Sequence, residues 1–228
     1  MKIIKMLGIK DIFTLINALF GFSSIIIATT GNIVLGSFLI FFAAIFDYLD
    51  GSIARATKLN KFGKELDSLA DIVSFGVTPA YILFLYTIKN SGIEGFLLIV
   101  SFLISFFFLS AGLLRLARFN ITEQTDFTGL PIPAAAMALV FSISMGLSPQ
   151  IAAIYSLLLS YLMVSDIKYM SQKQMSSRQI ILNSAISIII FLLLYYYSRK
   201  VLGVVGSIIA ALYIISPVIR KKPSASQN

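Results

Sequence analysis

The chain has 228 residues, of which 58% are hydrophobic and only 12% are charged, and its mean hydropathy is +0.92. A soluble domain carries about 45–50% apolar and about 25% charged residues, so this composition excludes a water-soluble globule. The sequence contains no cysteine and no histidine, which excludes disulfides, thiolate nucleophiles, imidazole acid–base chemistry and Cys/His zinc sites. Any chemistry must therefore use carboxylates, hydroxyls, amines or metal ions.

Apolar runs of membrane-spanning length, separated by polar, Pro or Gly breaks, predict an all-α polytopic membrane bundle with about eight transmembrane helices. The predicted spans are Ile12–Thr30, Ile33–Ala54, Leu66–Ile88, Phe96–Leu116, Pro131–Leu147, Ile151–Val164, Ile180–Ser198 and Leu202–Ile219. The sixth run is short, and the third is interrupted by Gly76 and Pro79. Seven spans is therefore the alternative count.

The placement of the basic residues predicts the topology. If the first helix starts in the cytoplasm, the inner loops and both tails hold 15 of the 18 Lys and Arg residues, and only Lys89, Arg199 and Lys200 lie outside. The positive-inside rule then predicts that both termini are cytoplasmic, in a protein of the cell membrane whose site faces the cytoplasm. The net charge of +8 is thus read as topology and contact with anionic lipid, not as nucleic-acid binding.

The chain divides into three predicted segments. Residues 1–11 are expected to form an amphipathic segment at the membrane interface, with a merely basic flank as the alternative. Residues 12–219 form the membrane-embedded domain, and residues 220–228 form a basic and polar disordered tail. Gly203, Gly206 and Ala210 in the last span suggest a homodimer, although small residues also pack helices within one chain.

Four of the ten acidic residues lie within 25 positions of one another, around the connection between the second and third spans. Asp47 and Asp50 are spaced i,i+3, and Asp67 and Asp71 are spaced i,i+4, so each pair lies on one face of its helix. A short connection brings the two faces together. We therefore expect the four carboxylates to converge near the membrane surface.

Carboxylates that converge repel one another, and proteins relieve the repulsion by protonation or by binding cations. A site made only of oxygen ligands favours Mg²⁺ or Mn²⁺, and four carboxylates are enough to hold two such ions against a diphosphate. One alternative is a solvated loop in which the acids pair with Arg55, Lys58, Lys61 and Lys64. Another is a cation-coupled transporter, whose acids are expected at mid-membrane within an inverted repeat.

Small residues stand beside both acid pairs, in the pattern Asp47-x-x-Asp50-Gly51-x-x-Ala54-Arg55-x7-Gly63-x-x-x-Asp67-x-x-x-Asp71. Glycine permits a ring or a phosphate to approach the backbone closely, and arginine suits phosphate. This stretch resembles the signature of the CDP-alcohol phosphatidyltransferases, membrane enzymes that move a phospholipid phosphate from a cytidine diphosphate lipid to an alcohol. All eight defining residues are present, and the seven-residue spacer is a residue or so shorter than usual.

The resemblance implies a role for each position of the motif. It implies metal ligands at Asp47, Asp50, Asp67 and Asp71, with Asp71 also acting as the catalytic base. It implies contacts to the CDP group from Asp47, Asp50, Gly51, Ala54, Arg55, Gly63 and Asn17. The implied donor is a lipid of the CDP-diacylglycerol or CDP-archaeol type, the other product is CMP, and a homodimer is expected.

Further segments resemble the phosphatidylserine synthase branch of the family. They are Thr14-Leu-Ile-Asn17 with Gly21, Ser68-Leu-Ala-Asp71 with Ser74-Phe-Gly76 and Pro79-Ala80, Arg115-Leu-Ala-Arg118-Phe-Asn120, and Gly129-Leu-Pro131-Ile-Pro133-Ala134-Ala135. The likeness implies L-serine as the acceptor. Serine needs a cation for its carboxylate and acceptors for its ammonium group, and we expect Arg118, Asn120 and Lys168 to contact it. Inositol phosphate or glycerol phosphate is the alternative acceptor.

Overall fold

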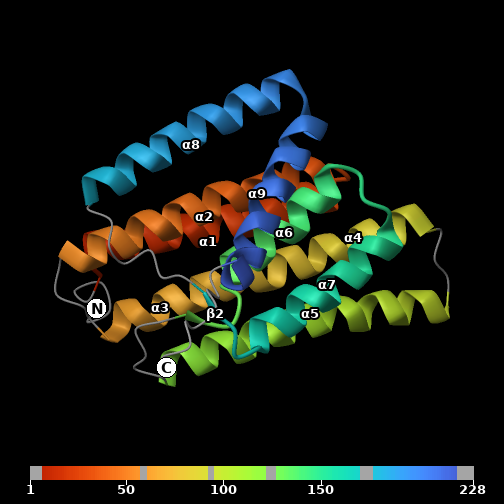
Figure 1. Cartoon of the computed structure of the whole chain (residues 1–228), viewed down its shortest axis with the longest axis horizontal. Helices are drawn as coiled ribbons and strands as arrows, with labels where there is room; N and C mark the ends of the chain where they lie inside the picture. The colour runs from red at the N-terminus through yellow and green to blue at the C-terminus, as the bar shows by residue number, and fades with distance from the viewer. Residues whose placement is uncertain (1–6, 57–60, 92–94, 122–126, 170–176, 220–228) are drawn as a thin grey trace, which may run out of the picture.

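The computed structural model describes residues 7–56, 61–91, 95–121, 127–169 and 177–219, and nearly all of them are helical (Figure 1). The helices are α1 (Ile9–Thr29), α2 (Ile33–Ala56), α3 (Lys61–Asp71), the π-helix η2 (Ile72–Val77), α4 (Thr78–Ser91), α5 (Phe96–Ile121), α6 (Ile132–Ser144), α7 (Pro149–Val164), α8 (Ser177–Tyr197) and α9 (Arg199–Ile219). Two short strands, β1 (Phe127–Thr128) and β2 (Lys168–Tyr169), complete the described elements.

The predicted all-α membrane bundle is confirmed. Since α3, η2 and α4 follow one another without a break, they form one long rod, and the described ranges contain eight rods at the predicted places. Within the described ranges, five helices are long and apolar enough to cross a membrane, and three more are apolar but shorter. The helices long enough to cross are Lys10–Thr29, Ile33–Gly51, Phe62–Lys89, Phe96–Ile121 and Arg199–Pro217.

The expected interruption of the third span is a π-helix. Its six residues, Ile72–Val77, begin directly after Asp71 and end before Thr78. Pro79 stands in the first turn of α4, and the Thr78 hydroxyl donates to the Val73 carbonyl at 2.8 Å. A π-helical turn widens the rod without ending it, and such turns are frequent at functional sites.

The strands were not part of the all-helical prediction. β1 and β2 pair antiparallel, with Phe127 opposite Tyr169 and Thr128 opposite Lys168, and so tie the segment after α5 to the segment after α7. Residues 1–6 and 220–228 lie outside the described residues, while the end of the predicted interfacial segment, from Ile9, already belongs to α1. That segment and the tail remain predictions.

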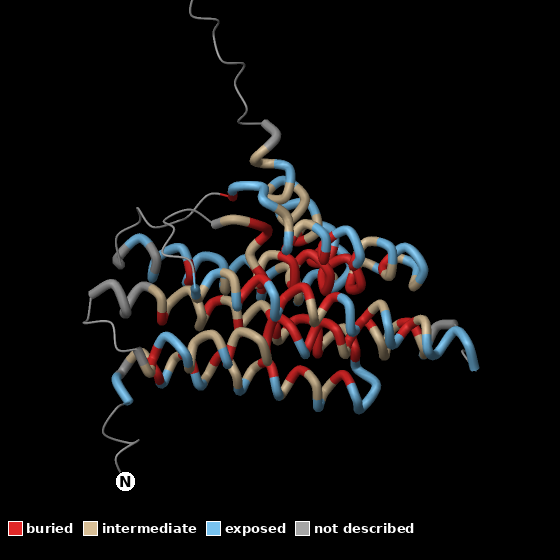
Figure 2. Tube along the Cα trace, turned by 90° about the horizontal axis from the view of Figure 1, so that it is seen from below, coloured by how far each residue is buried: buried red, intermediate tan, exposed pale blue. Residues whose placement is uncertain are grey.

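The bundle has apolar side chains on its outside, and its interior combines large apolar side chains with small and hydroxyl ones. Exposed Leu, Ile and Phe side chains cover α1, α5, α8 and α9, whereas the buried positions lie along the centre of the bundle (Figure 2). Some buried hydroxyls bond within their own helices: Ser37 donates to the Ile33 carbonyl at 2.9 Å, and Ser160 to the Ser156 carbonyl at 2.7 Å. Others join two helices. Lipid tails favour this arrangement because they solvate an apolar surface and leave small residues for helix–helix contacts.

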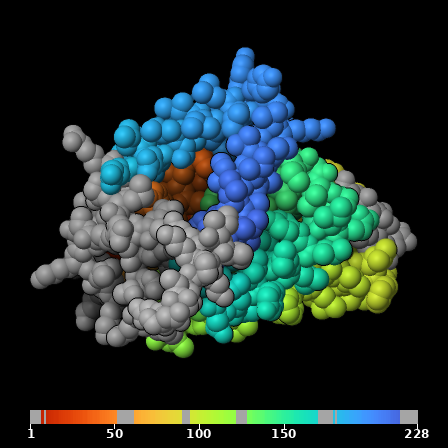
Figure 3. All heavy atoms as spheres, viewed as in Figure 1, coloured from red at the N-terminus to blue at the C-terminus, as the bar shows by residue number. Residues whose placement is uncertain are grey.

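The last two helices close the bundle by different contacts. α8 packs on α2 through aromatic rings, with Phe41 and Phe191 stacked at 4.3 Å between centroids, and α2 stays visible between α8 and α9 (Figure 3). On α9, a Cβ at Gly203 or Gly206 would collide with Met145 or Phe141 at the end of α6. This small-residue face is therefore used within the chain, and the homodimer remains an untested prediction.

Gly21 sets the distance between α1 and the π-helix. A Cβ at this position would lie 2.7 Å from the Cα of Ser74, too close for any real contact. Ser74 donates to the Asn17 carbonyl at 2.9 Å, and Thr78 donates to the Gly21 carbonyl at 3.1 Å. The hydrogen bonds from these two hydroxyls and the absence of a side chain at Gly21 thus hold η2 and the start of α4 close against α1.

We predict that Gly21→Ala lowers the thermal midpoint of the purified protein, although alanine is the better helix former by about 1 kcal/mol. Forcing a methyl group against a main-chain atom typically costs about 1–3 kcal/mol, which exceeds that gain. Thermal unfolding in detergent measures the shift. Phe22→Leu is the control, because Phe22 is exposed on the same helix, and an unchanged midpoint for Gly21→Ala would contradict the packing argument.

Candidate metal centre

Three carboxylates from two helices meet at one point. Asp47 lies on α2, Asp67 lies on α3 and Asp71 ends α3, and one oxygen from each lies within 4.8 Å of the others. The predicted convergence of the two acid pairs is therefore present in the structure. These three side chains form what we call the acidic cluster.

The fourth acid, Asp50, stands beside this cluster. Its side chain is buried and accepts a hydrogen bond from the Thr14 hydroxyl at 2.6 Å. It also interacts with Asp67. On the other side of the cluster, Asp71 interacts with Asp47 and accepts a hydrogen bond from the Asn17 amide at 3.1 Å. Every acid of the motif thus contacts another acid or a donor on α1.

One face of α1 serves the acidic cluster. Lys10, Thr14, Asn17 and Gly21 recur at intervals of four, three and four residues, so they lie along one side of the helix. Lys10 is close enough to Asp47, Asp50 and Asp67 for a favourable electrostatic interaction. Lys10 and Thr14 were not predicted as site residues. Their helical spacing from Asn17 was the signal that could have identified them.

A second basic residue approaches the acidic cluster from α5. Arg115 is buried, and its charge interacts favourably with those of Asp71 and Asp47. Its guanidinium carbon also lies 5.6 Å from the centre of the Phe119 ring. From the sequence, Arg115 is only one of the inner-loop basic residues and part of the segment that resembles the family branch. The fold gives it a place beside the carboxylates instead.

The two motif glycines have different surroundings. At Gly51, no described atom lies within 4 Å of where a Cβ would stand, so helix packing does not explain this glycine. At Gly63, a Cβ would lie 2.7 Å from the Asp11 carboxylate and 2.9 Å from the Lys10 side chain, so α3 approaches α1 closely there. Ala54 and Arg55 belong to α2, but their side chains lie outside the described residues.

The residues expected to contact serine are spread over three places. Asn120 pairs with Ser68 on α3, the nitrogen donating to the hydroxyl at 3.0 Å. Arg118 bonds to carbonyl groups at the end of α7, and Lys168 is exposed on β2. A cavity of about 150 Å³ lies between α5 and α7, lined by Leu114, Arg115, Arg118 and Val164.

The ligand set fits a hard divalent cation. All the converging atoms are carboxylate oxygens, which Mg²⁺ and Mn²⁺ accept more readily than zinc does. One oxygen of Asp67 is buried and has no hydrogen-bond partner among the described residues. A buried charged oxygen without a partner is costly, and a bound cation removes that cost.

The family comparison identifies the chain. The family model for CDP-alcohol phosphatidyltransferase matches residues 8–215, which include the acidic cluster, the motif glycines and the polar face of α1. The chain belongs to the CDP-alcohol phosphatidyltransferase family. Members of this family are enzymes that generally depend on divalent metal ions, in agreement with an all-oxygen site.

Three relatives are similar over most of both chains. The CDP-diacylglycerol–serine O-phosphatidyltransferase of Methanocaldococcus jannaschii is 43% identical over 167 residues, which cover 72% of this chain and 75% of that protein. The archaetidylserine synthase of Methanothermobacter thermautotrophicus is 33% identical over 174 residues, covering 74% and 72%. The CDP-diacylglycerol–serine O-phosphatidyltransferase of Helicobacter pylori is 34% identical over 223 residues, covering 92% and 89%.

We predict that Thr14→Val weakens metal binding without removing a ligand, because the Asp50 carboxylate loses the hydroxyl that orients it. Loss of such a supporting hydrogen bond typically lowers metal affinity by about 10–100-fold. The increase in thermal midpoint on Mn²⁺ or Mg²⁺ titration measures the affinity. Thr29→Val is the matched control, because Thr29 is an exposed threonine near the opposite end of α1. Equal metal affinity in both variants would refute the role of Thr14.

Proposed function

We propose that this chain transfers the phosphatidyl group of a CDP-diacylglycerol or CDP-archaeol type lipid to the hydroxyl of L-serine and releases CMP. The observation that carries the proposal is the meeting of the motif carboxylates in one cluster, in a chain whose relatives bear serine-transferase names. The family supplies the CDP-lipid chemistry. The relatives' names supply the acceptor.

The donor's diphosphate would lie against the acidic cluster. Asp47, Asp67 and Asp71, with Asp50 beside them, would hold Mg²⁺ or Mn²⁺ as two ions, which when bound neutralise the diphosphate and stabilise the leaving CMP. Because no described atom lies within 4 Å of where a Cβ of Gly51 would stand, a flat base or a phosphate would have access to the α2 backbone there. Ala54, Arg55, Gly63 and Asn17 complete the proposed CDP contacts.

Asp71 is the proposed base. The Asn17 amide donates to one of its oxygens and so fixes its orientation. Its carboxylate would accept the proton of the serine hydroxyl while the serine oxygen attacks the lipid-bearing phosphorus. A new phosphorus–oxygen bond forms, the bond to the CMP oxygen breaks, and CMP leaves with the electron pair. No covalent enzyme intermediate is needed for this single displacement.

Serine binding and membrane orientation follow as further parts of the proposal. Asn120, which contacts α3 one residue from Asp67, and Lys168 on β2 are the proposed serine contacts, whereas Arg118 in the last turn of α5 is already bonded to the end of α7. Lys10 and Lys64, near the acidic cluster, are among the basic residues assigned to the cytoplasmic loops and tails. By the positive-inside rule, the site would open to the cytoplasm at the inner face of the cell membrane.

A CMP-release assay on the purified protein tests the function. With CDP-lipid and Mn²⁺ or Mg²⁺ present, we expect release of CMP with L-serine and none with inositol phosphate, glycerol phosphate or water alone. Asp47→Asn, Asp50→Asn and Asp67→Asn should each abolish release, and chelation should reproduce their effect. Release with a different alcohol would correct the acceptor, and release with none would refute the transferase assignment.

We predict that Asp71→Asn separates binding from chemistry. The variant should still bind CDP-lipid and metal measurably, but its turnover with serine should fall by about 10²–10⁴, as expected when a general base is removed. Excess metal should restore little of this activity. Lipid affinity and turnover are measured across the same metal titration, with Asp67→Asn as the comparison. Full recovery of Asp71→Asn at high metal would show that Asp71 is only a ligand.

A further inference from the structure

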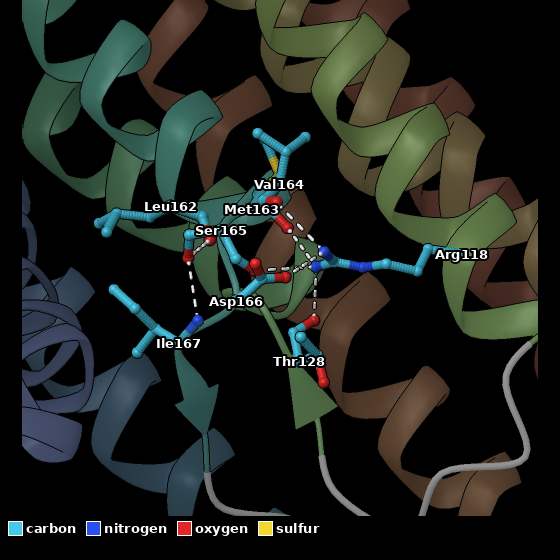
Figure 4. Close-up of polar contacts among 8 residues, drawn as sticks. All are labelled: Arg118, Thr128, Leu162, Met163, Val164, Ser165, Asp166 and Ile167. Atoms are coloured by element: carbon cyan, nitrogen blue, oxygen red, sulfur yellow. Dashed lines mark hydrogen bonds and ion pairs between the residues drawn. The ribbon is translucent and has the colours of Figure 1, made fainter.

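Arg118, in the last turn of α5, directs its guanidinium at the end of α7 (Figure 4). Its Nη1 donates to the Val164 carbonyl at 3.1 Å and lies 3.5 Å from the Asp166 carboxylate. Its Nη2 donates to the carbonyls of Thr128 at 2.9 Å, Ser165 at 3.0 Å and Met163 at 3.3 Å. Both terminal nitrogens of the guanidinium therefore have acceptors within the protein.

The carbonyl groups at the end of α7 need such donors. The last four carbonyls of a helix have no partner within it, and this end also carries the negative pole of the helix dipole. Leu130 donates its N–H to the Leu162 carbonyl at 2.9 Å, and Gly129 donates to the Ile167 carbonyl at 2.8 Å. Arg118 serves the carbonyls between them. A planar, permanently charged fork suits several acceptors at once better than a lysine does.

Gly129 is part of the same arrangement. Its φ of +78° lies in the left-handed region that favours glycine, and a Cβ there would collide with the Met163 carbonyl and with Nη2 of Arg118. Glycine is therefore required for the guanidinium to reach α7. We call Arg118, Gly129, Leu130 and the carbonyls from Leu162 to Ile167 the α7 clasp.

The α7 clasp is connected to the acidic cluster through α5. Three residues before Arg118, Arg115 interacts with the charges of Asp71 and Asp47. Two residues after it, Asn120 pairs with Ser68 on α3. The last turn of α5 is thus held to α7 on one side and lies against the carboxylates on the other.

We propose that Arg118 is a positioning residue: through the carbonyls at the end of α7 it holds the last turn of α5, and so places Arg115 and Asn120 against the acidic cluster. This role rests on the proposed function and differs from direct binding of serine. A serine ligand needs free guanidinium donors, whereas both terminal nitrogens are engaged by the protein. The glycine at position 129 is explained by the same contacts.

Kinetics of Arg118→Gln and Arg118→Lys, with turnover expressed per CDP-lipid-binding site, test the proposal. We expect lipid affinity and the number of binding sites to stay at the wild-type level, while kcat with serine falls by about tenfold or more and KM for serine changes by less than about threefold. Lysine should not rescue kcat. Asp166→Asn is the control, because the Asp166 side chain is almost fully exposed and its ion pair is long.

Amide hydrogen exchange supplies a second measurement. In both Arg118 variants, and in Gly129→Ala, the amides from Leu162 to Lys168 should exchange faster than in the wild type, because the helix end loses its clasp. Gly129→Ala keeps the arginine but displaces it, so it should share the fall in kcat. If this variant does not fold, Arg118→Gln and Arg118→Lys still decide the question.

Three outcomes would overturn the proposal. A rise in KM for serine of about tenfold or more, with kcat retained, would make Arg118 a serine ligand. A loss of lipid-binding sites in parallel with turnover would make its role generally structural. Unchanged exchange in the Arg118 variants would show that the clasp does not hold α7. A wild-type protein inactive with serine would refute the proposed function instead, and the exchange data would still report on the clasp.

Discussion

The constraint on which this structure depends is the repulsion among carboxylates that are held together inside an apolar bundle. Oxygens of Asp47, Asp67 and Asp71 lie within 4.8 Å of one another, with Asp50 alongside. The three side chains of the cluster are half-buried, and charges that are close and partly shielded from water repel strongly. The surrounding helices reduce this repulsion by supplying positive charge and hydrogen-bond donors. Lys10 on α1 and Arg115 on α5 supply the charge, and hydroxyl and amide groups of α1 supply the donors.

These contacts require α1 to lie very close to the continuous rod formed by α3, η2 and α4. Gly21 and Gly63 remove side chains at two points of the contact, and the Ser74 and Thr78 hydroxyls bond to carbonyls of α1. The π-helix begins immediately after Asp71 and turns these two hydroxyls towards α1. The same contacts between α1 and this rod therefore determine both the geometry of the site and the packing of the bundle. Few side chains could change here without affecting both.

The far side of the acidic cluster is built differently. There, α5 packs on α7 within the core, and hydrogen bonds from its last turn to the end of α7 and to β1 add to this packing. Backbone carbonyls at a helix end are strong acceptors, and an arginine can join several of them. The donor side of the site thus rests on helix packing, and the proposed acceptor side rests on helix packing together with a polar clasp. This division suits a site that must bind a lipid nucleotide and a small polar alcohol.

The sequence by itself determined the eight rods, the convergence of the acid pairs and the metal-compatible chemistry of the motif. These features are local: hydrophobic run length fixes a membrane helix, and spacings of three or four residues place side chains on one helix face. Only the tertiary structure decided what each face meets. In the fold, Gly203 and Gly206 face α6, and Lys10 and Thr14 lie beside the acidic cluster. Arg118 bonds to carbonyls at the end of α7. Such partners lie tens of residues apart in the chain, and helical periodicity carries no information about which helices become neighbours.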